Sequence, residues 1–430
     1  GTYGGAITAI LINTPGTPAA AATCLDGYPL AQKGEAARAL GMATFGSAFG
    51  GIFSVIVLVL FAPILANIAY EFGQPEYFAL AIFGLTMLAS IGEGSPVKNL
   101  LAGAFGILLS TVGKDIMTSV DRFTFGVGQL TEGIGFIPVV VGLFAISEML
   151  VQSTLTNQIF KRLAMKAVKL PTKEDFKYCF KTILRSSGIG SFIGILPAEG
   201  GTVASLIGYS EAKRWSKNPS KFGKGAIDGI AGAETANNAA TGGAMVPTLA
   251  LGIPGSATTA VILTGMIIHG LRPGPDLFKE QPEFLYGIFG SMFFANILFF
   301  IMGFFGAKLF ARITLIPSRL LWPMIFVLSV CGTYSLNQSF SDVLLMIIFG
   351  VIGFVLRKFG FSVVPIIIGL ILGQLVELTL RQSLVIFDGN YLLFFTRPIV
   401  VTFFVLSIIA LTFPYLKKKK HTYFKNKKTN

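Results

Sequence analysis

Apolar runs separated by short polar segments occupy most of the chain. A helix that crosses the hydrocarbon core of a bilayer needs about 20 predominantly apolar residues. Runs close to that length predict transmembrane helices at residues 41–70, 77–92, 96–113, 134–153, 284–307, 318–336, 341–356, 362–376 and 398–416. Three further apolar stretches, at residues 5–23, 183–208 and 226–270, are interrupted by Pro and Gly. The pattern predicts an all-α polytopic membrane protein with about 10–12 transmembrane segments, some re-entrant or broken.

Composition supports this class and excludes an ordinary soluble domain. Hydrophobic residues make up 53% of the 430 residues and charged residues 13%, whereas a soluble domain has about 25% charged residues. The net charge of +13 would suggest nucleic acid in a soluble protein. Here the cations lie in short loops beside apolar runs, so they report orientation and we expect no nucleic-acid partner.

Two of the interrupted stretches resemble each other. Gly4-Gly5-Ala6 leads to Asn13-Thr14-Pro15-Gly16-Thr17, and Gly242-Gly243-Ala244 leads to Gly252-Ile253-Pro254-Gly255-Ser256. A single Pro-Gly kink is common in packed membrane helices, but paired breaks in two halves of a chain are typical of a transport site. We therefore expect two structural repeats, with inverted topology as the favoured arrangement.

Cations also predict which side of the membrane each loop occupies. The basic segments at residues 161–185, 213–224 and 417–430 predict the cytoplasmic side, whereas the cation-poor loops at 71–76 and 388–391 fit the outer side. The stretch 183–208 then enters and leaves on one side. It is expected to form a re-entrant hairpin with its tip at residues 196–201.

These features predict the domain organisation. The first repeat covers residues 1–153, a basic cytoplasmic connector covers 154–182, the second repeat with C-terminal helices covers 183–416, and a basic tail covers 417–430. The chain opens inside the first motif region, so we expect an N-terminal part of the first repeat to be missing.

Several function classes lack the residues they require. Cys24, Cys179 and Cys331 have no metal-ligand spacing, and the two histidines, His269 and His421, cannot build a multi-histidine site. There is no Gly-Lys-Ser/Thr nucleotide loop. We expect no enzyme, no cofactor and no metal beyond a coupling ion. An ion channel and a carboxylate transporter of another duplicated family remain alternatives.

The chain resembles the large membrane subunit of the tripartite tricarboxylate transporter family. The first block of resemblance runs from Ala9 to Pro18 and continues with Asp26-Gly27-Tyr28-Pro29. The second includes Ala236-Asn237-Asn238-Ala239-Ala240, Gly252-Ile253-Pro254-Gly255-Ser256 and Pro273-Gly274-Pro275. The resemblance covers essentially the whole chain.

The resemblance implies a secondary transporter in the bacterial cytoplasmic (inner) membrane. It implies import of citrate-like tricarboxylates or dicarboxylates, driven by a Na⁺ or H⁺ gradient. It also implies two protein partners, a small membrane subunit and an extracytoplasmic solute-binding protein, in addition to the carboxylate substrate and the surrounding membrane lipid.

The residues themselves suggest where substrate and ion bind. A carboxylate needs hydrogen-bond donors, which a helix broken inside the membrane supplies through its backbone and nearby hydroxyl and amide groups. The substrate candidates are Asn13, Thr14, Pro15, Gly16, Thr17, Asn237, Asn238, Pro254, Gly255, Ser256 and Thr258. The ion-coupling candidates are Glu234, Asn238 and Asp26, because ionisable groups in membrane segments are functional by default. Structural alternatives remain: Glu234 as an interfacial residue or a cap, and Asp26 as a helix cap.

Overall fold

The structure is a computed structural model that describes residues 2–13, 15–91, 95–115, 117–154, 171–196, 200–313 and 318–426. The α-helices are α1 Gly4–Ile12, α2 Ala21–Leu30, α3 Ala36–Ala69, α4 Gln74–Ile91, α5 Pro96–Ser110, α6 Phe136–Val141, α7 Ser147–Thr154, α8 Lys173–Ile195, α9 Gly200–Trp215, α10 Ile227–Leu251, α11 Ala257–Ile268, α12 Leu277–Glu280, α13 Pro282–Ile313, α14 Ser318–Asn337, α15 Phe340–Lys358, α16 Val364–Ile386 and α17 Pro398–Asn426. Short 3-10 or π segments adjoin several of them, and the strands β1 Gly113–Lys114 and β2 Asp121–Arg122 form one small hairpin.

The all-α membrane class is confirmed. Within the described ranges, four helical stretches are long and apolar enough to cross a membrane, namely Pro18–Ala69, Pro282–Gly306, Phe340–Lys358 and Val364–Ile386. Shorter apolar helices lie at Pro96–Ser110, Phe136–Val151, Ala257–Ile268 and Pro398–Thr412. The 52-residue stretch contains a reversal at Gly34, whose φ is +85°, so it holds two helices that run in opposite directions.

The chain divides into two compact units that interleave along the sequence. Unit 1 comprises Gly1–Ala69, Asn157–Thr259 and Gly265–Leu321, and unit 2 comprises Tyr70–Thr156, Ala260–Thr264 and Trp322–Asn430. The chain returns from unit 2 to unit 1 close to the repeat boundary expected from the sequence. The assignment of repeats, connector and tail stays a prediction; most of the connector, residues 155–170, lies outside the described residues.

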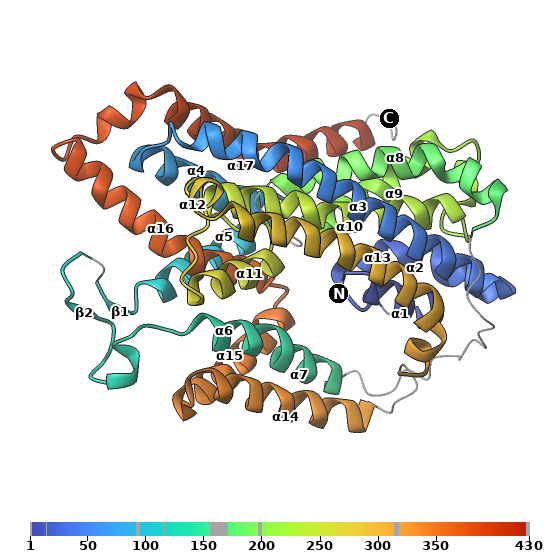
Figure 1. The fold of residues 1–430 in the computed structure, drawn as a ribbon, viewed down its shortest axis with the longest axis horizontal. Coiled ribbons are helices and arrows are strands. Elements are labelled where there is room, and N and C mark those ends of the chain that lie inside the picture. Colours follow the sequence, from blue (N-terminus) through green and yellow to red (C-terminus); the bar gives the residue numbers. More distant parts are fainter. Residues whose placement is uncertain are drawn as a thin grey trace. The chain divides into compact units, whose positions relative to one another are not determined.

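Helix α10 is the central element of unit 1, and nearly all of its side chains are buried. Figure 1 shows α3, α8, α9 and α10 side by side. They pack closely because glycines of the outer helices lie directly against the backbone of α10. Gly50 on α3 lies against Thr235, Gly190 on α8 against Ala236, and Gly208 on α9 against Gly232. Small residues allow this approach in lipid. These glycines therefore act as packing residues between the helices of unit 1.

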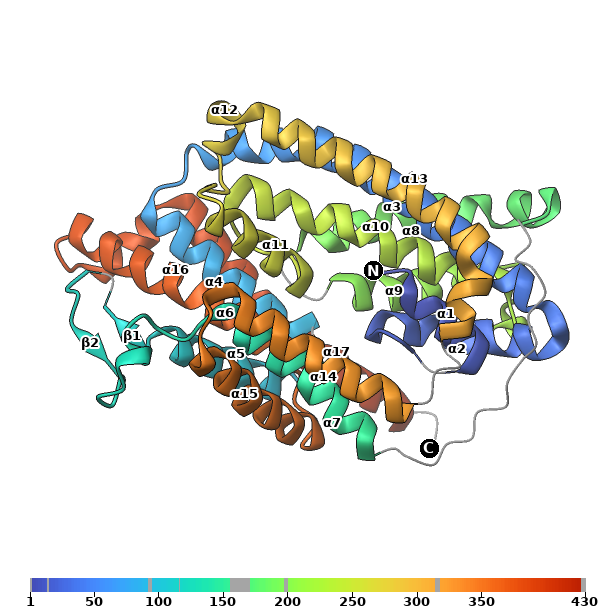
Figure 2. The same ribbon diagram turned by 60° about the horizontal axis from the view of Figure 1, so that its bottom comes forward.

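The contacts along α10 give the directions of its neighbours. Gly46 of α3 lies at Thr235 and Ser54 lies at Gly242, so α3 and α10 run the same way. On α9, Gly201 lies at Asn237 and Gly208 at Gly232, so α9 runs the opposite way. Helix α13 lies along α3 in Figure 2, with Asn296 against Gly51.

Helices α8 and α9 form the expected hairpin as far as they are described. They join the same face of α10 through Ile193, Ala204 and Ala240. Helix α8 begins with a capping box in which Thr172 and Asp175 exchange hydrogen bonds, and Asp175 also pairs with Arg38 of α3. Of the predicted tip, residues 197–199 lie outside the described residues. The starts of α3, α8 and α10 share one end of the unit, the end predicted to be cytoplasmic.

Unit 2 is organised around α5 and α16, which run the same way. Gly103 lies against Pro365, Gly106 against Ile366, and Gly373 against Ser110. At one end of this unit the buried carboxylate of Glu76 pairs with Arg397 at 3.1 Å. This ion pair joins the last residue of the cation-poor loop 71–76 to Arg397, which lies six residues after the cation-poor loop 388–391.

Candidate functional site

The two Pro-Gly breaks have the same backbone conformation. Helix α1 ends at Asn13 with φ +53°, and α10 ends at Gly252 with φ +69°; both are left-handed. In each case the amide of that residue donates to the carbonyl oxygen five residues earlier, Thr8 or Pro247. A left-handed residue is a common way to end a helix; in the second break the amide of Ile253 also donates to the carbonyl oxygen of Pro247, at 3.3 Å. The similarity seen in sequence is therefore a similarity of local structure.

After each cap the chain folds back along the helix it has just left. A Cβ on Gly16 would lie 2.8 Å from the Cα of Gly5, and a Cβ on Gly255 would lie 2.7 Å from the Cα of Ala244. Real Cβ atoms do not approach backbone so closely, so only glycine fits at either position. The next helix therefore begins beside the middle of the previous one.

The next residue in each break is extended, but the two side chains differ in their partners. Ser256 forms a capping box with Thr259 at the start of α11. Thr17 occupies the corresponding place, and its hydroxyl oxygen is buried with no hydrogen-bond partner in the part of the chain that the structure describes. The first break thus leaves one hydroxyl group available to a bound molecule.

Glu234 lies in the middle of α10 and is completely buried. Thr23 of α2 donates a hydrogen bond to Oε1, and Ser47 of α3 donates to Oε2 at 3.1 Å. Asn238, one turn along α10, donates from Nδ2 to the Ser47 hydroxyl at 2.7 Å. Among the described side chains these partners are neutral. A buried carboxylate held this way is uncharged or binds a cation.

Asn237 points to a different side of α10. Its side chain is only 1% exposed, and neither Nδ2 nor Oδ1 has a hydrogen-bond partner among the described residues. A Cβ on Gly201 would lie 2.9 Å from Oδ1, so the amide faces the first turn of α9. Buried amides are nearly always hydrogen-bonded, so an open one needs an explanation. A bound polar ligand would supply it.

Helix α9 also connects Asn237 with the first break. One turn beyond Gly201, the hydroxyl of Ser205 donates to the carbonyl oxygen of Ala19 at 2.7 Å. Ala19 is two residues from Thr17. The open hydroxyl of Thr17 and the open amide of Asn237 therefore both lie beside the first two turns of α9.

Asp26 has a structural contact. Its Oδ1 accepts hydrogen bonds from the backbone amides of Gly225 and Ala226, at 2.7 and 2.8 Å. Those amides immediately precede α10, so Asp26 caps that helix from α2, as a carboxylate does at a helix N-terminus. This is the capping alternative weighed from the sequence.

The remaining candidates occupy the breaks. Pro254 and Gly255 are buried, whereas Asn13, Pro15, Gly16 and Thr258 are exposed, and Thr14 lies outside the described residues. No hydrogen bond joins the two breaks in the described part of the chain, and each packs on its own preceding helix.

The structure brings Glu234 and Asn238 together with Thr23 and Ser47, which were not among the sequence candidates. Ser47 stands in a segment of small residues, 46–51, in which a hydroxyl group carries no distinct sequence signal of a hydrogen-bonding role.

Comparison with known proteins gives one family. The model of the tripartite tricarboxylate transporter TctA family matches residues 1–368. The chain is 39% identical over 427 residues to an uncharacterized 52.8 kDa protein in the TAR-I ttuC' 3' region of Agrobacterium vitis, covering 98% of this chain and 85% of that protein. It is 37% identical over 238 residues to an uncharacterized protein in the TAR-II ttuC' 3' region of the same organism, covering 55% of this chain and 98% of that protein. No solved structure matches.

Proposed function

Because this chain belongs to the tripartite tricarboxylate transporter TctA family, we propose that it imports citrate-like tricarboxylates or dicarboxylates by coupling them to a Na⁺ or H⁺ gradient. The observation that carries the proposal is the pair of open polar side chains, Asn237 and Thr17, beside the start of α9. An amide donor, a hydroxyl donor and a helix N-terminus are suited to a carboxylate.

The second break supplies further candidates for the same path. Pro254 and Gly255 are buried, and Ser256 with Thr259 caps the start of α11. We assign Asn13, Thr14, Pro15 and Gly16 with Thr258 to the walls of the substrate path, because they follow or form the breaks. Asn237 and Thr17 have the stronger support, since their polar atoms are buried without partners.

Glu234 is the proposed coupling group. Its carboxylate accepts hydrogen bonds from neutral hydroxyl groups of α2 and α3, and Asn238 of α10 donates to one of these hydroxyls. Gain or loss of one cation therefore changes the charge in the interior of unit 1. Asn238 orients Ser47 toward the carboxylate, and this is the role proposed for it in coupling. Asp26 is occupied by the cap of α10 and contributes by fixing that helix.

Inverted repeats are supported by the helix directions in unit 1. Helices α1 and α2 run the same way, since Gly5 lies against Ala20 and Gly27 against Ile10. Thr23 and Ser47 reach Glu234 from either side of Gly34, so α2 and α3 run in opposite directions. Helix α3 is parallel to α10, which makes α1 antiparallel to α10. The two similar breaks thus point in opposite directions, as inverted repeats require for alternating access.

The proposed setting is the bacterial cytoplasmic membrane. We propose that a small membrane subunit and an extracytoplasmic solute-binding protein act with this chain. The carboxylate would then be delivered at the outer face and released at the end where α8 and α10 begin.

The test is uptake of labelled citrate and a panel of dicarboxylates by cells that make this chain with its small subunit and binding protein. We expect saturable uptake that requires the binding protein and an imposed Na⁺ or H⁺ gradient. Non-saturating flux independent of the binding protein would favour a channel. Absence of carboxylate uptake with all components in the membrane would refute the proposed substrate class.

A further inference from the structure

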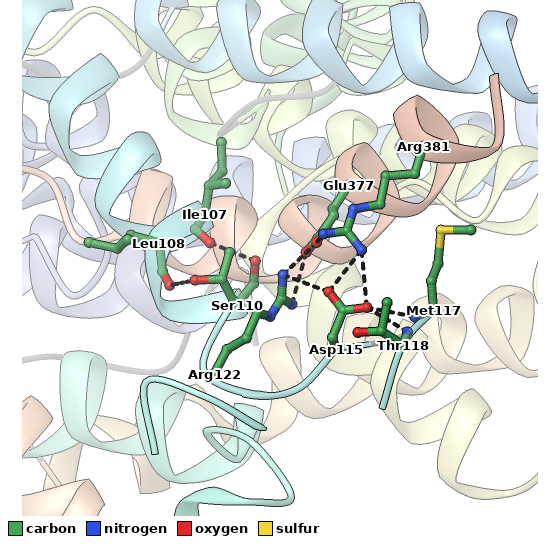
Figure 3. A network of polar contacts seen from close by, with 10 residues as sticks. Ile107, Leu108, Ser110, Asp115, Met117, Thr118, Arg122, Glu377 and Arg381 are labelled. Atoms are coloured by element: carbon green, nitrogen blue, oxygen red, sulfur yellow. Dashed lines mark hydrogen bonds and ion pairs between the residues drawn. The ribbon is translucent and has the colours of Figure 1, made fainter. Parts of the chain in front are cut away.

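A cluster of four charged side chains fastens the β1–β2 hairpin to α16 in unit 2 (Figure 3). Asp115 follows β1 and pairs with Arg381 of α16 at 2.8 Å and with Arg122 of β2 at 3.1 Å. Arg122 also forms a two-bond pair with Glu377 of α16, at 2.6 and 3.1 Å. The cluster contains two carboxylates and two guanidinium groups, so their charges cancel. We therefore interpret the cluster as a structural attachment.

The same carboxylate shapes the loop of the hairpin. Oδ1 of Asp115 accepts hydrogen bonds from the amides of Met117 and Thr118, at 2.9 and 2.8 Å. The amide of Asp115 donates to the carbonyl oxygen of Val120 at 2.9 Å. The loop is therefore held in a defined shape before any partner arrives.

The segment that follows this attachment presents apolar side chains outward. Phe125 is 85% exposed and Val120 is 62% exposed, and Met117, Phe123 and Val127 are also exposed. Both phenylalanines have positive φ, +53° at Phe123 and +50° at Phe125. Bulky residues rarely adopt that conformation and pay about 1–3 kcal/mol for it. Five exposed apolar side chains, two on the shaped loop between the strands and three directly after β2, indicate a contact surface.

The position of the attachment along α16 indicates what this surface contacts. Glu377 and Arg381 stand nine and five residues before the end of α16 at Ile386, which corresponds to about 13 and 8 Å along the helix. Helix α16 is one of the stretches long enough to cross a membrane. Its last turn exposes Val385 and Ile386. The hairpin is therefore attached near the end of α16 that the sequence places on the outer side, within about two to three turns of the exposed Val385 and Ile386.

We propose that residues 117–127 insert their apolar side chains into the interfacial region of the outer leaflet. The hydrocarbon core is excluded because this loop is not helical and would carry unsatisfied backbone groups there. The headgroup region offers water to the backbone and acyl chains to the side chains at once. The loop thereby fixes the outer end of α16 at the membrane surface. This inference does not depend on which solute is carried.

The test places a single tryptophan in the loop. The variant Phe125→Trp is made in a Trp215→Phe, Trp322→Phe background, and the full chain is reconstituted in phosphatidylcholine with or without bromine on the acyl chains. We expect bromine to quench the reporter at position 125 and iodide in the water to quench it weakly. Val120→Trp in the same background is the second reporter, should the first variant fold poorly.

The control is native Trp215 in the variant Trp322→Phe. Trp215 is 62% exposed beside the basic residues Arg185 and Arg214, so we expect iodide to quench it and brominated lipid to leave it unchanged. The proposal is overturned if the loop reporters behave like Trp215. A protein partner would then be the occupant to seek.

Discussion

At the scale of single residues, two neighbouring asparagines on α10 have different tasks. Asn238 is bonded to Ser47 and to the carbonyl oxygen of Glu234, so it belongs to the hydrogen-bond network around Glu234. Asn237 has no partner for either polar atom. Neighbouring helix positions face different directions, so under the proposed assignment one helix serves the ion and the substrate on separate sides.

Replacing Asn237 tests the substrate side. Asn237→Asp keeps the shape of the side chain but adds a negative charge that repels a carboxylate, and Asn237→Ala removes the donor. A hydrogen bond to a charged group contributes about 1.5–3 kcal/mol, so Asn237→Ala is expected to lower kcat/KM for uptake about 10-fold to 100-fold. Asn237→Asp is expected to lower it further. Uptake kinetics at several substrate concentrations measure both.

The melting temperature separates this role from a structural one. Asn237 makes no hydrogen bond within the described chain, so Asn237→Ala should leave the thermal unfolding of the purified protein nearly unchanged. Thr23 does bond to Glu234, and Thr23→Val should lower the unfolding temperature. Equal destabilisation by both variants would contradict the assignment of Asn237 to substrate.

The sequence predicted part of this network. Glu234 and Asn238 were recognisable because a carboxylate and amides are rare among small apolar residues of a membrane helix. Thr23 and Ser47 were not among the candidates, because a hydroxyl in a small-residue segment looks the same whether it packs or donates. Only the fold brings them within hydrogen-bond distance of a residue about 190 to 210 positions later.

At the scale of elements, the breaks were predictable and the reversal at Gly34 was not. Pro-Gly motifs mark a helix end by removing a donor and allowing unusual backbone angles. Gly34 stands alone between Lys33 and Glu35 in a polar segment, which is consistent with an ordinary loop. Its positive φ, which turns α2 back onto α3, is visible only in the structure.

Glycine substitutions test the fold-back geometry of the second break. Gly255→Ala places a Cβ against the backbone of Ala244, so we expect a marked loss of folded protein. The matched control is Gly290→Ala on α13, where no atom lies within 4 Å of the added Cβ. It should be neutral or stabilising by up to about 1 kcal/mol, as for glycine to alanine in a helix. Size-exclusion profiles and thermal unfolding in detergent measure both; equal behaviour would contradict the described break.

Low pH should detach the β1–β2 hairpin from α16. Backbone and side-chain hydrogen bonds from Thr118, a hydrogen bond from Met117 and the guanidinium of Arg381 hold the pKa of Asp115 well below its usual range, although desolvation opposes them. Arg122 and Glu377 also face this carboxylate. Because the pKa of Asp115 is lowered in the folded protein, the attachment is stabilised at pH values above the ordinary carboxyl pKa of about 4. This stabilisation is lost as the pH falls through the lower pKa of the folded state.

The tryptophan reporter of the Phe125→Trp variant measures this pH dependence. Its quenching by brominated lipid should be constant from neutral pH down to about pH 4 and should decline only below that. The variant Asp115→Asn should show weaker quenching at neutral pH. A decline already between neutral pH and about pH 5 would contradict the role given to Asp115.

At the scale of the whole molecule, each half of the sequence contributes to both units. In unit 1, α3 from the first half of the sequence packs on α10 from the second half. In unit 2, α5 from the first half packs on α16 from the second half. Hydropathy predicted the membrane class and the broken segments, because both depend on local composition. Pairing between the halves depends on glycine contacts between distant residues, which no local pattern reveals.

Sidedness is a testable property of the complete chain. The basic loop before α10 is expected in the cytoplasm and the loop after α16 outside. In a variant without native cysteines, Lys217→Cys should resist an impermeant maleimide in intact cells and react after lysis. Asp388→Cys should react in intact cells. The opposite pattern at either site would invert the proposed direction of transport.

The most direct test of the central claim is accumulation of labelled carboxylate against its gradient by the complete transporter, compared with the Glu234→Gln variant. Glutamine keeps the size of the side chain but cannot take up or release a cation. Wild type should accumulate substrate when a Na⁺ or H⁺ gradient is imposed, and the variant should only equilibrate it, while Glu174→Gln, an exposed control on α8, should behave as wild type. Undiminished gradient-driven accumulation by Glu234→Gln would contradict the account.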